Sequence, residues 1–231
     1  AVGMTMIIVS GGIDLSVGST IALTGVATAL ALHRSWPPVI AILAAVALGG
    51  LVGMVNGLVI TRLRVVPFIA TLGMLGVARG AAKWLAGEMT VGAPETWINE
   101  MAVTFPSRAW MVVAPGVWIT LLIAVAASLA LQRTVFGRHV FAIGSNEIAA
   151  RACGIAVTRM KIAIYALAGC TFGLAGVMQM SRLRQGDPTV AAGVELDIIA
   201  AVVIGGGSLS GGQGSILGAM IGALIMAFLR N

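Results

Sequence analysis

Residues 11–19 read GGIDLSVGS and place one carboxylate and two hydroxyls inside a stretch that is otherwise apolar. An ionisable side chain in lipid is costly, so it normally faces a protein interior or a water-filled path. The paired glycines free the backbone, and Asp14 or Ser16 can then cap a new helix. A broken helix in a membrane is tolerated only where protein buries it or where it lines a cavity. We interpret the run as part of a translocation pathway or its frame; the alternative is that Asp14 only caps a helix at the membrane surface.

The composition predicts an all-α polytopic membrane protein, a multi-span helical bundle with broken helices. Of the 231 residues, 59% are hydrophobic and 10% are charged, whereas soluble domains carry about 25% charged residues. The 31 glycines suit membrane helices that pack closely. The net charge of +6 does not indicate nucleic-acid binding, because the basic residues gather in short loops as membrane topology requires. Cys153 and Cys170 do not suggest a disulfide framework.

Apolar segments of about 20 residues predict the membrane spans. We expect them at 1–10 (the end of one span), 14–32, 37–60, 66–85, 113–131, 161–180, and a split region at 192–206 and 214–229. The chain starts without Met, is apolar at once and stops after an apolar segment. We therefore expect 1–231 to be one transmembrane domain from a longer protein that has further spans before and after it.

The basic residues predict which loops are cytoplasmic. Counting spans puts loops 61–64 and 132–160 on one side, with seven Lys and Arg: Arg62, Arg64, Arg133, Arg138, Arg151, Arg159 and Lys161. The other side, 33–36, 86–112 and 181–191, carries four: Arg34, Arg108, Arg182 and Arg184. The positive-inside bias makes the first side cytoplasmic. The outer loops hold most of the acids and three of the five tryptophans, Trp110 among them.

Charged side chains near the outer ends of spans have two interpretations. Arg79 and Lys83 lie one turn apart and are expected to snorkel to lipid headgroups, with a role in the pathway as the alternative. Glu195 and Asp197 are expected at the outer entrance of the last apolar region, where they either face a polar solute or cap the segment.

Glycine patterns predict close helix packing and suggest a weak internal sequence repeat, called the echo below. Two sets at four-residue spacing form small faces: Gly49, Gly53 and Gly57, and Gly214, Gly218 and Gly222. Asn56 lies beside the first face, where an interhelical hydrogen bond is its expected role. The runs 10–16 and 205–212 both precede helices, and paired glycine-interrupted segments can mark a transport site at a repeat interface.

The sequence predicts no nucleotide, catalytic or metal site in this chain. Residues 209–213 read LSGGQ, like the signature of transport ATPases, but they lie between membrane segments. A GxxxxGK[ST] phosphate loop is absent, since neither Lys83 nor Lys161 follows a glycine in that pattern. HExxH and GxSxG motifs are absent as well.

Loop 132–160 contains a predicted two-turn helix. Ser145 or Asn146 suits its N-cap, Glu147 its first turn and Gly154 its C′ position. A helix this short is unstable alone, so something must hold it. Its small face suits docking into a groove on another protein, and an ordinary connecting helix is the alternative.

Three stretches together resemble the permease subunit of bacterial ATP-binding-cassette sugar importers, of the ribose-type permease family. They are AVGMTMIIVSGGIDLSVGS at 1–19, FGRHVFAIGSNEIAARACGI at 136–155, and ELDIIAAVVIGGGSLSGGQGSILGAMIGALI at 195–225. The resemblance implies a dimeric permease, of identical or different subunits, in the bacterial inner membrane. It implies two ATPase subunits that bind the ATP, a periplasmic sugar-binding protein, surrounding lipid, and no cofactor held by this chain.

Related permeases dock a cytoplasmic Glu-Ala-Ala-x-x-x-Gly loop in the ATPase cleft, and here Ile148 displaces the Glu by one residue. The coupling role carries over to Gly144, Asn146, Glu147, Ala149, Ala150 and Gly154. The sparse polar residues are candidates for a weak sugar pathway: Asp14, Ser16, Ser19, Asn56, Glu195 and Asp197. The solute would be ribose or another pentose or hexose. Alternatives are a permease for nucleosides or branched-chain amino acids, an ion-coupled secondary transporter, and a receptor without flux.

Overall fold

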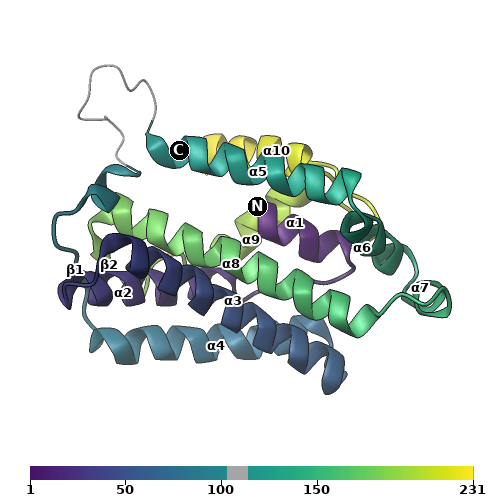
Figure 1. The fold of residues 1–231 in the computed structure, drawn as a ribbon, viewed down its shortest axis with the longest axis horizontal. Helices are drawn as coiled ribbons and strands as arrows, with labels where there is room; N and C mark the ends of the chain where they lie inside the picture. Colours follow the sequence, from purple (N-terminus) through teal and green to yellow (C-terminus); the bar gives the residue numbers. More distant parts are fainter. Residues whose placement is uncertain (103–113, 231) are drawn as a thin grey trace.

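The computed structural model describes residues 1–102 and 114–230. The described residues form ten α-helices, a short 3-10 helix and one pair of two-residue strands (Figure 1). The helices are α1 (Val2–Val9), α2 (Val17–His33), α3 (Pro38–Arg62), α4 (Pro67–Ala86), α5 (Pro115–Arg133), α6 (Val135–Ser145), α7 (Glu147–Ala152), α8 (Val157–Leu183), α9 (Val194–Ile204) and α10 (Ile216–Arg230). The 3-10 helix η1 is Trp97–Glu100, and β1 (Val91–Gly92) pairs antiparallel with β2 (Gln185–Gly186). Arg108, Trp110 and the first residue of the predicted span 113–131 lie outside the described residues.

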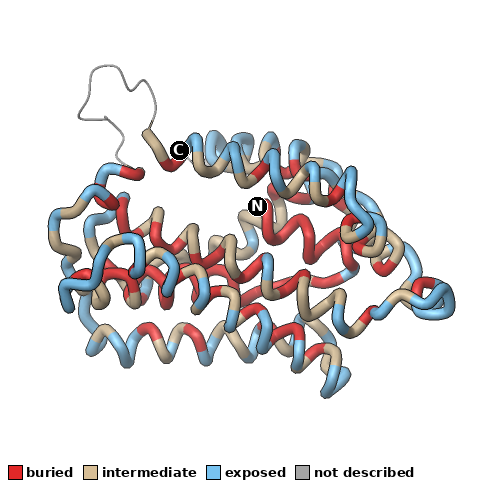
Figure 2. Tube along the Cα trace, viewed as in Figure 1, coloured by how far each residue is buried: buried red, intermediate tan, exposed pale blue. Residues whose placement is uncertain are grey.

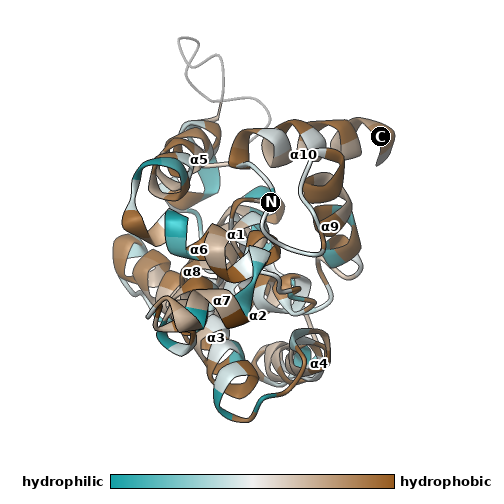
Figure 3. Ribbon diagram, turned by 90° about the vertical axis from the view of Figure 1, so that its right-hand side faces the viewer, coloured by the Kyte–Doolittle hydropathy of each residue, from teal (hydrophilic) through white to brown (hydrophobic). Residues whose placement is uncertain are grey.

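The long helix α8 runs the length of a layered bundle. Figures 1 and 3 show α5 and α10 on one side of α8 and α1, and α4 on the opposite side. The short helices α1 and α9 lie between these layers. The prediction of an all-α bundle with broken helices is confirmed for the described residues.

The core follows α1 and α2 rather than the longest helices (Figure 2). All eight residues of α1 are buried, and so are 13 of the 17 residues of α2. By contrast, large apolar side chains are exposed along α3, α4, α5 and α10. Three helices are long and apolar enough to cross a membrane: Pro38–Arg62, Pro115–Arg133 and Val157–Leu183. The exposed apolar belt is therefore the lipid-facing surface of a polytopic membrane protein.

Small residues let α3 and α8 pack backbone to backbone. A Cβ added at Gly49 would collide with the carbonyl oxygen of Gly169, and one at Gly53 with that of Tyr165. The second predicted face works in the same way, since Gly218 and Gly222 pack against α9. The close packing predicted from the four-residue glycine spacing is thus confirmed for both helix pairs, except at Gly214, which lies before α10 with φ of +149° and is not on its face.

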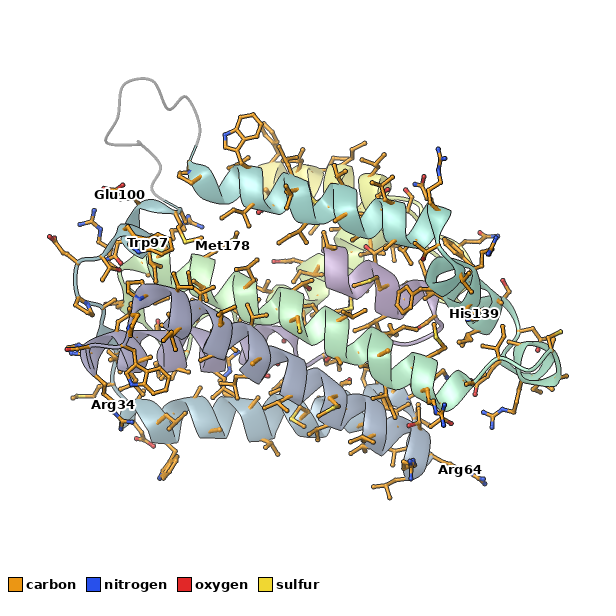
Figure 4. All side chains as sticks on the ribbon, in the orientation of Figure 1. Arg34, Arg64, Trp97, Glu100, His139 and Met178 are labelled. Carbon is orange, nitrogen blue, oxygen red and sulfur yellow. The ribbon has the colours of Figure 1, made fainter. Side chains whose placement is uncertain are left out.

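The loops group at two ends of the bundle as the span count predicted, except that the part of loop 181–191 after β2 lies inside the bundle. Figure 4 shows Arg34, Trp97 and Glu100 at one end, and Arg64 and His139 at the other. We call these the β1–β2 end and the α7 end. Strand pairing joins the 86–112 loop to the 181–191 loop, and one pocket holds side chains of both the α3–α4 turn and α7.

The polar loop 132–160 contains more structure than the sequence predicted. Besides the expected short helix it forms α6, whose N-cap Thr134 accepts a hydrogen bond from the backbone N–H of Gly137 at 3.3 Å. Gly137, Val140 and Ile143 form its buried face at helical spacing. An amphipathic helix on the bundle therefore replaces the first half of the expected loop.

Candidate functional site

The break between α1 and α2 is closed by a buried polar cluster from two helices. Asp14 Oδ1 accepts hydrogen bonds from the backbone N–H of Ser16 at 2.7 Å and from its hydroxyl at 2.6 Å. From α3, Asn56 Nδ2 donates to Asp14 Oδ2 at 3.3 Å and to Ser16 Oγ at 3.0 Å. Ser19, also buried, donates to the Ser16 carbonyl. Asp14 thus binds Ser16, the residue at the N-cap of α2, and no side chain of the described residues caps the helix by a hydrogen bond. The interhelical bond predicted for Asn56 is confirmed.

Two further side chains hold the same link, and the sequence analysis missed both. Thr71 of α4 accepts a hydrogen bond from the backbone N–H of Leu15 at 3.1 Å. Tyr165 of α8 donates its hydroxyl to the carbonyl oxygen of Ile13 at 3.5 Å. A signal was available for one of them, since Tyr165 is the chain's one tyrosine and lies inside an apolar span. The α1–α2 link is therefore held by α3, α4 and α8 together.

A cavity of about 140 Å³ lies between α1, α2, α5, α8 and α9, with Ala1 and Val2 in its lining. Its lining is apolar apart from the hydroxyls of Thr120 and Thr171, with Met178 between α5 and α8 (Figure 4). Both hydroxyls donate to carbonyls of their own helices, so their oxygen lone pairs are left to accept hydrogen bonds. None of the six predicted pathway residues lines this cavity, but Asp197 lines a neighbouring cavity of about 250 Å³ between α9 and α10.

Glu195 does not lie at the outer entrance, as the sequence analysis expected. It stands beside the first turn of α2, where a Cβ added at Gly18 would lie 2.7 Å from Glu195 Oε2. Gly18 is about 22 Å along the helix axis from His33 at the β1–β2 end. The expectation was wrong because the chain after β2 runs inward without forming a helix until Val194, so α9 begins deep in the bundle.

Arg79 of α4 holds this inward segment instead of snorkelling to headgroups. Its Nη1 donates to the carbonyl oxygens of Pro188 at 2.9 Å and Val190 at 2.7 Å. Irregular backbone at membrane depth leaves carbonyls that need partners, and the guanidinium supplies them. Lys83, one turn further along α4, is exposed and remains placed for snorkelling.

Helix α7 has a defined cap at each end. Asn146 Oδ1 accepts the backbone N–H of Ala149 at 2.9 Å, which confirms Asn146 as the N-cap. At the other end Gly154 has φ of +82°, and its N–H binds the Arg151 carbonyl at 3.1 Å. The N–H of Ile155 binds the carbonyl of Ala150 at 3.1 Å. This pair of bonds is a Schellman motif with glycine at C′, as predicted.

One face of α7 is attached to its own bundle. Glu147 Oε2 accepts a hydrogen bond from Nζ of Lys161 on α8 at 2.6 Å, and Glu147 Oε1 pairs with Arg151 at 3.0 Å. The hydrogen bond from Lys161 holds the pKa of Glu147 below its usual value. Ala150 is only 5% exposed and packs with Ile143 and Val157. These contacts supply the support that so short a helix needs.

The other face of α7 is open to solvent and carries Ile148, whose exposed fraction is 84%. Of the predicted coupling residues, Asn146, Ala149 and Gly154 are also exposed, whereas Ala150 faces inward. Sequence reasoning treated Ile148 as an interruption of a motif. Its signal was an apolar residue in the first turn of a helix whose other residues are small or charged.

Gly144, also predicted for coupling, lies where three glycine-containing segments meet. A Cβ added at Gly144 would collide with the carbonyl oxygen of Val9, which itself accepts the N–H of Gly212 at 2.8 Å. Gly211 in turn packs against Gly11 and the carbonyl of Gly144. The LSGGQ run therefore packs between the ends of α1 and α6, and the two glycine runs of the predicted echo touch each other.

Comparisons with known proteins agree with this architecture. The family model described as branched-chain amino acid transport system / permease component matches residues 1–231. The ribose import permease protein RbsC of Escherichia coli (strain K12) is 42% identical over 231 residues, covering 100% of this chain and 72% of that protein. RbsC of Bacillus subtilis (strain 168) is 44% identical over 233 residues, 100% of this chain and 71% of that protein. The L-arabinose ABC transporter permease protein AraH of Azospirillum brasilense is 36% identical over 231 residues, 100% of this chain and 67% of that protein.

No solved structure matches the chain. The family match covers every residue, including the α1–α2 link, the α6–α7 loop and the glycine-rich run before α10. The resemblance inferred from those three stretches is confirmed. The chain belongs to the branched-chain amino acid transport system / permease component family.

Proposed function

We propose that the chain is the membrane-spanning subunit of an ATP-driven importer that carries a sugar into the cytoplasm across the bacterial inner membrane. The whole-chain family match supports this proposal, as do relatives whose names give ribose import and L-arabinose transport. In this account the chain itself is not catalytic and holds no cofactor, and a separate ATPase subunit binds ATP.

The observation that carries the proposal is the construction of α7. The helix is capped at both ends, tied to α8 through Glu147, and exposes Ile148 beyond the end of the membrane helices. A rigid helix with one exposed apolar side chain is suited to a groove on a partner protein. The excess of Lys and Arg in the loops at this end supports a cytoplasmic location for α7, on the side where the ATPase subunit would bind.

The contacts of Gly144 offer a route from that partner to the membrane helices. Helix α6 ends at Ser145, one residue before the N-cap of α7, so a displacement of α7 would be passed on to α6. Gly144 packs on Val9 at the end of α1 and on Gly212 before α10. A push on α7 would therefore shift α1, whose Val2 lines the cavity of about 140 Å³, and the glycine-rich run that precedes α10. In this proposal the pathway would pass Thr120 and Thr171, which line one cavity, and Asp197, which lines the other, while Asp14, Ser16, Ser19 and Asn56 would hold the neighbouring α1–α2 link.

The larger assembly follows from the same proposal. Alternating access needs two permease halves, so a second copy or a homologous subunit would lie alongside this one in the lipid. A periplasmic binding protein would deliver the solute at the β1–β2 end, and affinity would reside in that protein rather than in the sparse polar lining.

The lining of the cavity between α5 and α8 favours a neutral solute. Hydroxyl oxygens of Thr120 and Thr171 can accept hydrogen bonds from a sugar, and no charged side chain lines this cavity among the described residues. A zwitterionic amino acid would need opposite charges there. Ribose, another pentose or a hexose is therefore the proposed solute class, with nucleosides and branched-chain amino acids as rivals.

Reconstitution of the full-length permease with its ATPase and binding protein tests the proposal. We expect uptake of labelled ribose or arabinose that requires ATP, resists uncouplers and exceeds uptake of leucine or uridine at least tenfold. Uptake without the ATPase that an uncoupler abolishes would assign a secondary transporter instead. A complex that binds ligand but shows no flux would assign a receptor.

A further inference from the structure

A polar pocket of about 430 Å³ lies at the α7 end, apart from the cavities already described. It lies between the turn that joins α3 to α4 on one side and α7 with the start of α8 on the other. The residues that line it are Ile60, Thr61, Arg64, Val65, Val66, Pro67, Glu147, Arg151, Val157, Thr158 and Lys161. Segments almost 100 residues apart in the chain thus build one site.

The pocket has an excess of positive charge. Arg64, Arg151 and Lys161 line it together with a single carboxylate, Glu147. Glu147 already pairs with Lys161 at 2.6 Å and with Arg151 at 3.0 Å. Arg64 has no ion pair or hydrogen-bond partner within residues 1–102 and 114–230. The pocket thus offers an unpaired guanidinium next to a carboxylate that is shared by two cations. This arrangement is suited to an anion with several oxygen atoms, such as a phosphate.

One rim of the pocket is apolar and continues into the lipid-facing surface of α4. Leu63, Val66 and Ile69 are 70%, 59% and 60% exposed, and Phe68 lies beside them. These side chains precede and begin α4, whose exposed apolar residues belong to the lipid-facing belt described above. A free phosphate or another soluble anion would leave these apolar side chains uncovered. The occupant that satisfies both parts of the site has an anionic head and an apolar tail.

We propose that this pocket binds the phosphate headgroup of an anionic phospholipid from the leaflet at the α7 end, with acyl chains along Leu63, Val66, Phe68 and Ile69. Basic pockets between membrane helices on the cytoplasmic side bind such headgroups. Because Arg151 and Lys161 also hold Glu147 of α7, the bound lipid would brace the attachment of α7 to α8.

Thermal unfolding of the full-length permease in a neutral detergent tests the site. The probes are short-chain phosphatidylglycerol, phosphatidylcholine with the same chains, and inorganic phosphate. We expect phosphatidylglycerol to raise the melting temperature, with little effect of the other two. Arg64→Gln should weaken the affinity for phosphatidylglycerol, obtained by titrating the lipid, roughly tenfold, because it removes a charge-assisted contact. Arg64→Lys should weaken this affinity less.

Arg62→Gln is the matched control, because Arg62 is an exposed arginine two residues away that does not line the pocket. The proposal is overturned if inorganic phosphate stabilises as well as the lipid, or if Arg62→Gln and Arg64→Gln weaken binding equally. Native mass spectrometry of the permease with and without its ATPase gives a second measurement. Retention of phosphatidylglycerol in the complex supports the lipid site, and its release on assembly would mean that the pocket receives a protein side chain instead.

Discussion

Nζ of Lys161, in the second turn of α8, lies 2.6 Å from Oε2 of Glu147, the first residue of α7. This contact joins a six-residue helix to the 27-residue helix that crosses the whole bundle. It is one of the two side-chain ion pairs among the described residues, and Glu147 takes part in both. The attachment of the proposed coupling helix therefore depends strongly on one carboxylate.

Removing the charge of Glu147 should loosen α7 without unfolding the bundle. Glu147 is partly exposed, so Glu147→Gln should cost below about 1 kcal/mol of stability, yet it should reduce ATP-driven uptake several-fold. A spin label on Cys153, an exposed thiol just after α7, would report the motion of the helix once Cys170 is replaced by Ala. Glu88→Gln, at the opposite end, is the control; equal label mobility in Glu147→Gln and wild type would contradict the anchor.

The same label should reveal a dependence on pH. The hydrogen bond from Lys161 depresses the pKa of Glu147 in the folded protein. The anchoring is thus fully present above the unfolded pKa of about 4.3 and is lost as pH falls through the lower, folded-state pKa. We expect the label to stay restricted from pH 7 to 5 and to become mobile under stronger acid. In Glu147→Gln the mobility at pH 7 should already be high and change little with pH.

Asn56→Ala should destabilise the protein more than its small size suggests. The change leaves Asp14 Oδ2 without its partner inside the bundle, and an unpaired buried polar group costs about 1–3 kcal/mol. Leu58→Ala is the comparison, because Leu58 is a larger side chain on the same helix that is exposed to lipid. Thermal melting should rank Asn56→Ala as the more harmful; the reverse order would mean that the polar cluster does not hold the α1–α2 link.

Arg79→Ala should free the inward segment that precedes α9. Without the guanidinium, the carbonyls of Pro188 and Val190 lose their donor. We expect a cysteine introduced by Thr189→Cys to react faster with a water-soluble maleimide in the Arg79→Ala background. Lys83→Ala, on the same helix and exposed, should leave the labelling rate unchanged. Equal labelling rates in the Arg79→Ala and Lys83→Ala backgrounds would show that Arg79 does not hold the segment.

Gly144→Ala tests the close packing between α6 and α1. A Cβ at this position would strike the Val9 carbonyl, and overpacking typically costs about 1–3 kcal/mol. Gly73 of α4 offers a matched control, since nothing lies within 4 Å of a Cβ added there. Gly73→Ala should be neutral or stabilising because alanine favours the helix. Equal melting temperatures for the two variants would show that α6 does not pack on α1 as described.

Local patterns in the sequence were enough to predict the bundle, its two ends and both caps of α7. Caps depend on residues within one turn, so Gly154 could be predicted from its neighbours and the N-cap narrowed to Ser145 or Asn146, of which the structure has Asn146. The glycine spacing likewise predicted that α3 packs closely on another helix, because small residues in register are a property of one helix face.

Tertiary contacts account for what the sequence analysis missed. Glu195 was placed at an outer entrance because apolar sequence was assumed to be helical from one membrane surface to the other. The chain instead runs inward beside α2 before α9 starts, and the partner that permits this, Arg79, is more than 100 residues earlier. Tyr165 and Thr71 reach the α1–α2 link only after the helices assemble, so even the one sequence signal, a single tyrosine in an apolar span, does not say which backbone it binds.

Co-purification of the ATPase subunit with an Ile148→Glu permease tests the central claim most directly. Ile148 contributes its exposed side chain to the proposed docking face and little to the fold, so the variant should insert and melt like wild type. The account predicts that the ATPase is lost from Ile148→Glu but retained by Met89→Glu, an exposed apolar position at the β1–β2 end. Full retention of the ATPase and normal uptake by Ile148→Glu would contradict the assignment of α7 as the coupling helix.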